Sequence, residues 1–150
     1  MVNTAVQVVV FALGEEEYAM PIEVVREITP LTEVRAIPQA PSYVRGLINL
    51  RGTAIPLIDL HVRFGVSELS IPSTFALITE VHGNPVGFAV DQVREVRILE
   101  NIVPPPALVT APFIGGIVNL PDRIILKLIP EKILENNEMQ GLSQLSTVSW

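Results

Sequence analysis

The sequence has no cysteine and only two histidines, and aromatic residues make up 5% of its 150 positions. Without cysteine the chain has no disulfide framework, no thiolate metal site and no cysteine nucleophile. Charged residues are also few, at 17% with a formal net charge of −6, where about 25% is usual. Nucleic-acid binding needs a basic surface that displaces counterions, so this acidic balance argues against it.

Long apolar runs are missing as well, although 49% of the residues are hydrophobic. No run approaches the ~20 residues that span a bilayer, because Glu, Arg, Pro or Gly interrupts each one. The first residues also lack the basic segment of a signal peptide, which predicts a cytoplasmic protein without direct membrane insertion. The apolar fraction is far above that of disordered chains, so a packed core is expected.

Valine, isoleucine and leucine supply most of the hydrophobic content, with 20 Val, 16 Ile and 16 Leu. The β-branched residues pack well on a pleated surface, and 13 prolines divide the chain into short segments. This pattern predicts an all-β barrel or sandwich with short helices. Strands are expected at 5–13, 18–20, 33–37, 43–50, 53–58, 74–81, 86–90, 92–99, 115–120 and 123–129, and helical turns at 21–26, 59–64 and 130–135.

Between these elements the sequence predicts a polar link over residues 66–73, a proline-rich loop over 101–112 and a frayed tail over 139–150. Pro56 has no backbone N–H to donate, so it is expected at a sheet edge or at a bulge.

Three short motifs occur twice in the same order. Phe11-Ala-Leu13 returns as Phe75-Ala-Leu77, Val25-Arg-Glu-Ile28 as Val93-Arg-Glu-Val96, and Gly46-Leu-Ile-Asn-Leu50 as Gly116-Ile-Val-Asn-Leu120. The preserved order favours a duplicated unit of about 65–70 residues over chance similarity between two β-rich halves. Units of this size are marginally stable alone, so they should share apolar surface, and a groove is expected at their junction.

A search for catalytic chemistry finds no convincing set. His61 and His82 have no zinc-ligand spacing, and neither a nucleotide-binding glycine loop nor a nucleophile elbow is present. The sequence therefore predicts no enzyme, no metal and no cofactor. Glu27 and Arg51 stand out because they lie within apolar segments, where an unpaired charge is costly. They can form a structural salt bridge, the rim of a binding groove, or both.

The ordered motifs resemble the CheW family of bacterial chemotaxis coupling proteins. The resemblance rests on residues 11–28, 41–52, 55–60, 86–96 and 116–120, above all Asn49-Leu-Arg-Gly52, Ile55-Pro-Leu-Ile-Asp-Leu60 and Val86-Gly-Phe-Ala-Val-Asp91. It covers roughly residues 6–135. It implies two SH3-like, five-stranded β-barrels packed against each other, with a C-terminal helix. It also implies a non-enzymatic scaffold that couples chemoreceptor signalling tips to the histidine kinase CheA.

The resemblance further implies where the partners bind. A helical-hairpin tip of a methyl-accepting chemotaxis receptor would lie in the groove between the barrels. By matching positions, this receptor groove comprises Val9, Ile22, Val25, Glu27, Ile28, Gly46, Arg51 and Val93. The regulatory domain of CheA is placed more loosely, at Val34, Ile37, Pro38, Pro41 and Val44. The protein would thus reside in the cytoplasm, at membrane-associated receptor arrays, through its partners.

Residues 1–150 are expected to form a single CheW-like domain, with the first barrel at approximately 1–70 and the second at approximately 71–138. Terminal strands of the two barrels can be exchanged in this scheme. Two alternatives stay open: a CheW-like module of a larger protein, either a CheA regulatory domain or a CheV-type adaptor, and a small-ligand-binding β-barrel. The start at Met1 and the short tail favour a free-standing protein.

Overall fold

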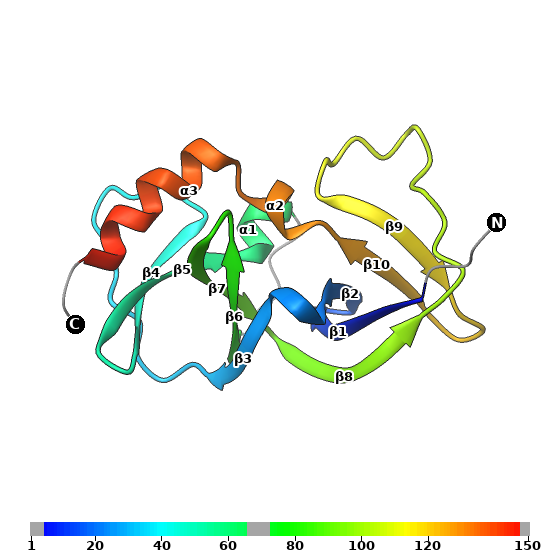
Figure 1. Cartoon of the computed structure of the whole chain (residues 1–150), viewed down its shortest axis with the longest axis horizontal. Helices are drawn as coiled ribbons and strands as arrows, with labels where there is room; N and C mark the ends of the chain where they lie inside the picture. The colour runs from blue at the N-terminus through cyan, green and yellow to red at the C-terminus, as the bar shows by residue number, and fades with distance from the viewer. Residues whose placement is uncertain (1–4, 66–72, 148–150) are drawn as a thin grey trace.

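The computed structural model describes residues 5–65 and 73–147, which form two five-stranded sheets with short helices between and beyond them (Figure 1). The strands are β1 (Val6–Leu13), β2 (Glu16–Pro21), β3 (Val25–Pro30), β4 (Val44–Leu50), β5 (Thr53–Asp59), β6 (Phe75–Val81), β7 (Asn84–Val90), β8 (Gln92–Leu99), β9 (Ile114–Asn119) and β10 (Ile124–Leu128). The helices are η1 (Ile22–Val24), α1 (Leu60–Phe64), α2 (Pro130–Ile133), α3 (Asn136–Ser143) and η2 (Gln144–Thr147). This confirms the predicted mostly-β fold with a C-terminal helix.

The two sheets have the same design. Sheet A has the strand order β8-β1-β2-β10-β9, and sheet B has the order β3-β6-β7-β5-β4. Each contains one parallel pair, β2 with β10 or β7 with β5, among antiparallel neighbours. Isolated bridges from Arg35 to Leu47 and from Val103 to Ile117 bring the chain beyond β3 and β8 against the opposite edge strand. These bridges partly close each sheet into a barrel.

Neither sheet is a contiguous half of the chain. Strands β1 and β2 join β8, β9 and β10, whereas β6 and β7 join β3, β4 and β5. Sheet membership therefore does not follow the approximate division at residue 70; the two halves of the chain exchange their first two strands. The repeated motifs occupy matching places in the two sheets, since β1 matches β6, β3 matches β8 and β4 matches β9.

The buried apolar residues form three clusters. One lies within sheet A and is built on Val8, Val10 and Leu99, and another lies within sheet B around Ile55 and Leu57. The third, which we call the junction core, collects side chains from both sheets and from the C-terminal helices. Its buried members are Val9, Phe11, Leu13, Tyr18, Met20, Val44, Ile58, Leu60, Leu77, Val81, Val86, Phe88, Val90, Leu128, Ile133, Leu134, Met139 and Leu142. The expected sharing of apolar surface between the two units is thus confirmed.

The end of the chain is more ordered than predicted. The segment expected to fray from residue 139 instead continues α3 and η2 as far as Thr147; residues 148–150 lie outside the described residues. Helix α3 begins with a capping box in which Glu135 and Glu138 each accept a hydrogen bond from the other's backbone N–H. Met139 and Leu142 then bury their side chains in the junction core, which fixes the helix on the protein.

Two other local expectations differ from the structure. Residues 33–37 contribute a single bridge at Arg35 rather than a strand. Pro56 lies in β5, an interior strand, so the edge alternative is wrong, but the pairing of β5 with β4 does have a register shift between Val44 and Gly46, close to Pro56. Its missing N–H is tolerated because the parallel pairing of β5 with β7 covers only Leu57, Ile58 and Asp59. Most of the predicted polar link, residues 66–72, lies outside the described residues.

The predicted short helix at 59–64 is confirmed as α1. The Asp59 carboxylate accepts the Val62 N–H at 3.2 Å as an N-cap, and Gly65 ends the helix in the left-handed conformation. None of the helices in the described parts of the chain is long and apolar enough to cross a membrane.

Candidate functional site

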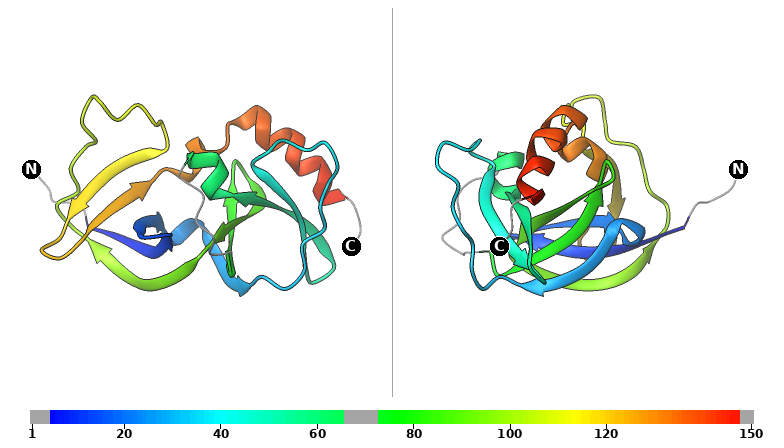
Figure 2. Two further views of the ribbon diagram at one scale, coloured as in Figure 1. Left: turned by 180° about the vertical axis from the view of Figure 1, so that it is seen from behind. Right: turned by 60° about the vertical axis from the view of Figure 1, so that its left-hand side comes forward.

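The most prominent candidate site lies where the edge strands β3 and β8 meet the junction core. Both strands run along the same side of the molecule, one from each sheet (Figures 1 and 2). Val25 and Val93, at equivalent positions near the start of each strand, are partly buried and pack against the junction core, as does Ile22 of η1. Val9 lies beneath them and is only 2% exposed. The predicted groove residues Val9, Ile22, Val25 and Val93 therefore all belong to one apolar region.

Ile28 gives this region an exposed apolar side chain. Side chains of β3 alternate between exposed and half-buried. Ile28 is one of the exposed side chains, with 42% of its surface accessible. An isoleucine on an edge strand with this exposure is not required by the core. It is available to a partner, whereas Val9 and Val25 also stabilise the fold.

Glu27 and Arg51 form an ion pair in this region. An Arg51 guanidinium nitrogen lies 2.6 Å from Glu27 Oε2, and 73% of the Arg51 side chain is exposed. Arg51 occupies the tight β4–β5 turn with φ of 51°, and Asn49 Oδ1 accepts the next backbone N–H, that of Gly52. The hydrogen bond that Arg51 donates to the Glu27 carboxylate raises the pKa of Arg51. The pair therefore presents an exposed guanidinium held in place by a half-buried carboxylate.

Gly46, by contrast, lies where sheet B closes. It is buried in β4 with φ of +153°, and a Cβ atom at this position would come within 2.2 Å of the Arg35 carbonyl oxygen. The Arg35–Leu47 bridge holds that carbonyl in place. A side chain would thus disturb barrel closure, and this steric reason alone requires glycine at position 46.

The predicted kinase-contact residues lie in and after the loop that joins β3 to β4. Ile37, Pro38, Pro41 and Val44 line an apolar groove of about 400 Å³ between this loop and α3, to which Gly141, Leu142 and Leu145 also contribute. Val34 packs against the sheet B cluster instead of lining this groove. Val44 is largely buried and belongs to the junction core.

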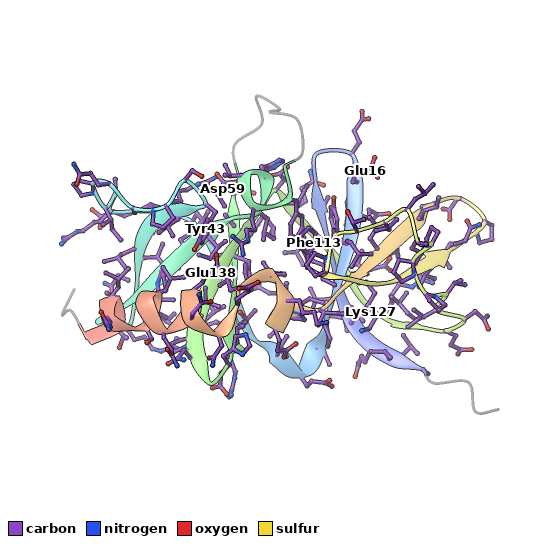
Figure 3. All side chains as sticks on the ribbon, turned by 90° about the horizontal axis from the view of Figure 1, so that it is seen from above. Glu16, Tyr43, Asp59, Phe113, Lys127 and Glu138 are labelled. Carbon is purple, nitrogen blue, oxygen red and sulfur yellow. The ribbon has the colours of Figure 1, made fainter. Side chains whose placement is uncertain are left out.

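A polar network, which the sequence did not reveal, fixes α3 beside this groove. The Glu138 carboxylate accepts hydrogen bonds from Arg63 at 2.6 Å and from the Tyr43 hydroxyl at 3.1 Å. Arg63 also lies over the Tyr43 ring, 4.5 Å from its centroid, and donates to the Ile133 carbonyl at 2.8 Å. Figure 3 shows Tyr43 and Glu138 close together beside α3. Burial alone would raise the pKa of Glu138, but its hydrogen bonds outweigh burial and lower it.

Sequence reasoning also missed a buried polar contact between the two sheets. Asp91 lies at the crossover from β7 to β8, and its carboxylate is 3.0 Å from His61 Nε2. The same carboxylate accepts the Gly14 N–H at 2.6 Å and the Ser73 hydroxyl at 3.2 Å. These partners are at least 18 residues away in sequence, so no local motif signals the contact. Its position indicates a structural role in joining sheet B to the β1–β2 turn.

Comparison with known proteins identifies this arrangement. The profile of the CheW-like domain family matches residues 7–138, which covers both sheets. The chain belongs to the CheW family. A chemotaxis protein CheW from Treponema pallidum is 35% identical over 149 residues, covering 93% of this chain and 88% of the relative. A CheW protein from Klebsiella aerogenes is 33% identical over 136 residues, covering 87% of this chain and 82% of the relative.

A solved structure supports the same assignment. The crystal structure of the scaffolding protein TtCheW from Thermoanaerobacter tengcongensis is similar with a TM-score of 0.80 and 35% identity. The similarity covers 90% of this chain and 96% of that one. The chain is therefore a chemotaxis scaffold of the CheW family and not an enzyme. In the described residues of this CheW family member, no cluster of three or more His, Asp or Glu side chains is placed to hold a metal ion.

Proposed function

We propose that this CheW family member couples the helical-hairpin tips of methyl-accepting chemotaxis receptors to the regulatory domain of the histidine kinase CheA. The proposal assigns one partner to each of two apolar surfaces on different elements. The receptor takes the apolar surface at β3 and β8, and the kinase takes the groove between the β3–β4 loop and α3. The protein would reach membrane-associated receptor arrays in the cytoplasm only through these partners.

The observation that carries the proposal is the combination of apolar and charged groups at β3. Ile28 is exposed, Val25 is partly buried against the junction core, and Glu27 of the same strand forms an ion pair with the exposed Arg51 guanidinium. A groove lined by valine and isoleucine accepts the apolar face of an amphipathic helix. An exposed guanidinium at its rim suits the carboxylates and terminal carbonyl groups of a helical hairpin. This apolar surface therefore suits a helical partner better than a small polar ligand.

The second surface supports a separate kinase contact. In Figure 1, α3 lies on a different side of the molecule from β3 and β8. Its groove is mainly apolar and is lined by prolines and a glycine, which leave room for a partner's side chains. Two partners on separate surfaces can bind at the same time, as coupling requires. The interface at each surface would be small, as is usual for signalling complexes that associate and dissociate.

The proposal can be tested by two variants with opposite effects. Ile28→Asp places a charge in the receptor groove, and Gly141→Leu fills the kinase groove, since no atom lies within 4 Å of a Cβ at Gly141. We expect Ile28→Asp to weaken binding of a receptor hairpin fragment by about tenfold or more and to leave CheA binding unchanged. Gly141→Leu should do the reverse. Calorimetry with both partners measures each Kd.

Val62→Asp on α1 is a matched control, since Val62 is an exposed valine outside both grooves. It should bind both partners like the unmodified protein. Failure of the unmodified protein to bind either partner would overturn the proposed function. Equal loss of both partners in both variants would show that the two surfaces are not separate.

A further inference from the structure

We infer that the receptor groove consists of two equivalent half-sites, one on β3 and one on β8, so that each arm of a helical hairpin occupies one of them. This inference rests on the proposed receptor-binding function and adds a second set of contact residues. The half-site on sheet B comprises Val25, Glu27, Ile28 and Arg51. The half-site on sheet A comprises Val93, Glu95, Val96, Ile98 and Arg123.

The first support is the equivalence of the two strands. Val25-Arg-Glu-Ile28 and Val93-Arg-Glu-Val96 are the same motif, 68 residues apart. Each motif lies on the edge strand of its sheet, beside the strand that carries the repeated Phe-Ala-Leu motif. The order of parallel and antiparallel neighbours across the two sheets is identical. The fold therefore places two copies of one binding motif on the same side of the molecule (Figure 2).

The second support is that matching side chains have matching surroundings. Val25 and Val93 are both partly buried against the junction core. Ile28 is 42% exposed and its counterpart Val96 is 51% exposed. In the strand register Val96 lies opposite Val9, which is part of the apolar region beneath the groove. The β8 motif thus continues the groove and is not a separate patch.

The third support is the ion pair at each motif. Glu27 pairs with Arg51 of the β4–β5 turn, and Glu95 pairs with Arg123, which immediately precedes β10. In both cases the hydrogen bond that the arginine donates to the glutamate raises the pKa of the arginine. Arg123 also lies 3.2 Å from Glu17. Each half-site therefore carries a guanidinium fixed by the glutamate of its own edge strand.

The half-sites differ in two ways that bear on which arm each accepts. Ile98 is 58% exposed and adds a second apolar side chain beyond Val96, where sheet B has Pro30. Arg26 lies 2.8 Å from Glu80, whereas the equivalent Arg94 lies 3.9 Å from Glu17. Strand β8 is thus more apolar than β3, and its Arg94 is less tightly paired than Arg26 of β3. Its complement is a helix whose apolar stripe is flanked by carboxylates.

A helical hairpin is the occupant that uses both half-sites at once. Its two arms are joined, so binding of one arm raises the effective concentration of the other at the second half-site. A single helix has one apolar stripe and would occupy only one half-site. The hairpin should therefore bind more tightly than either arm alone, and the loss of either half-site should remove this advantage.

The first test compares Val96→Asp with Ile28→Asp. Both side chains are exposed, so neither change should unfold the protein, and circular dichroism checks this. We expect each variant to weaken binding of the receptor hairpin fragment by about tenfold or more, with Val62→Asp again as the control. If the unmodified protein binds and Ile28→Asp weakens binding but Val96→Asp does not, the two-half-site inference is wrong while the receptor-binding function stands.

The second test assigns the arms, and the absence of native cysteine makes it simple. Ile28→Cys and Val96→Cys each provide a unique thiol, which is oxidised with hairpin fragments that carry one cysteine in either arm. Disulfide formation joins the two thiol sulfurs, and the added oxidant takes up the two electrons and two protons. We expect the two variants to cross-link to different arms. Cross-linking of both to the same arm would overturn the inference, and no cross-link in either would count against the receptor groove itself.

Discussion

The junction core and the interiors of the two barrels differ in size and in kind. Eighteen buried residues form the junction core, whereas six form the cluster within each sheet, counting only the described parts of the chain. Every phenylalanine and tyrosine of the sequence lies in the junction core or packs against it. Phe64 stacks on Phe113 with ring centroids 4.4 Å apart, and the Tyr18 ring contacts Phe64 in a tilted arrangement at 5.4 Å.

This contrast shows where the fold obtains its stability. A barrel with six small aliphatic residues inside buries too little apolar surface to be stable alone. The phenylalanines and tyrosines, which bury much surface per side chain, are concentrated in and around the junction core. The proposed receptor groove lies directly above this core, since Val25 and Val93 contact it. The same region therefore stabilises the fold and carries the proposed receptor contact. Variants of buried and of exposed residues can distinguish the two roles.

The largest effect should follow from a cavity in the junction core. Leu128 in this core and Leu99 inside sheet A are both fully buried leucines on strands of sheet A. Leu128→Ala should cost about 4–5 kcal/mol of unfolding free energy and Leu99→Ala about 2–3 kcal/mol, within the range known for buried leucines. The junction variant should also speed amide exchange in both sheets, and the Leu99 variant mainly in sheet A.

Urea unfolding and hydrogen exchange provide these two measurements. Equal costs, with exchange raised in sheet A alone for both variants, would show that the junction core does not hold the two sheets together.

A smaller effect is expected at the closure of sheet B. Gly46→Ala would place a Cβ within 2.2 Å of the Arg35 carbonyl oxygen, so the 31–43 loop must move, at a cost of about 1–3 kcal/mol. Gly141→Ala is the control, because that Cβ has no neighbour within 4 Å. Thermal unfolding should show a lower Tm only for Gly46→Ala. An unchanged Tm would mean that the bridge at Arg35 is dispensable.

Glu138→Gln tests the attachment of α3 to the junction. The pKa of Glu138 is lowered in the folded state from the ordinary value of 4.5, which we take for the unfolded chain. The charged carboxylate therefore stabilises the folded protein at pH values above 4.5. That contribution is lost as the pH falls below 4.5 and through the folded-state pKa. The variant should lose about 1–3 kcal/mol at pH 7 and differ little from the unmodified protein at strongly acidic pH. The exposed Glu23→Gln serves as a control.

Stability measurements from pH 7 to pH 3 would show the effect. A difference between Glu138→Gln and the unmodified protein that stays constant over this range would rule out the charge as its cause.

The smallest effect on stability should come from the rim of the groove. Arg51→Ala removes an exposed guanidinium from the pair with Glu27, and exposed ion pairs stabilise proteins little. We expect almost no change in Tm but about tenfold weaker binding of the receptor hairpin fragment. A large drop in Tm would show that the pair is structural.

Much of this fold was predictable from sequence, since the strand and turn pattern is local. The β-branched runs and the positions of Gly65 and Pro130 indicated most strands and short helices, and the repeat indicated two units of one design. The exchange of β1 and β2 between the sheets was not determined by these patterns, because pairing depends on contacts across the whole chain. The groove residues came from a family resemblance, and the structure shows that Gly46 serves barrel closure.

Long-range polar contacts were beyond sequence reasoning. Tyr43 and Glu138 are 95 residues apart, and His61 and Asp91 are 30 apart. Neither pair forms a local motif, and each side chain is common at protein surfaces. The extent of the C-terminal helical region was underestimated for a related reason: residues 136–143 are polar and weakly patterned, and burial of Met139 and Leu142 stabilises α3.

The central claim is that a receptor hairpin binds across β3 and β8. The most direct measurement is an amide chemical-shift titration of the isotope-labelled protein with a receptor hairpin fragment. We expect the amide signals of residues 25–29 and of Gln92–Leu99 to shift and those of α3 to stay unchanged. Shifts confined to α3 and the 31–43 loop would contradict it.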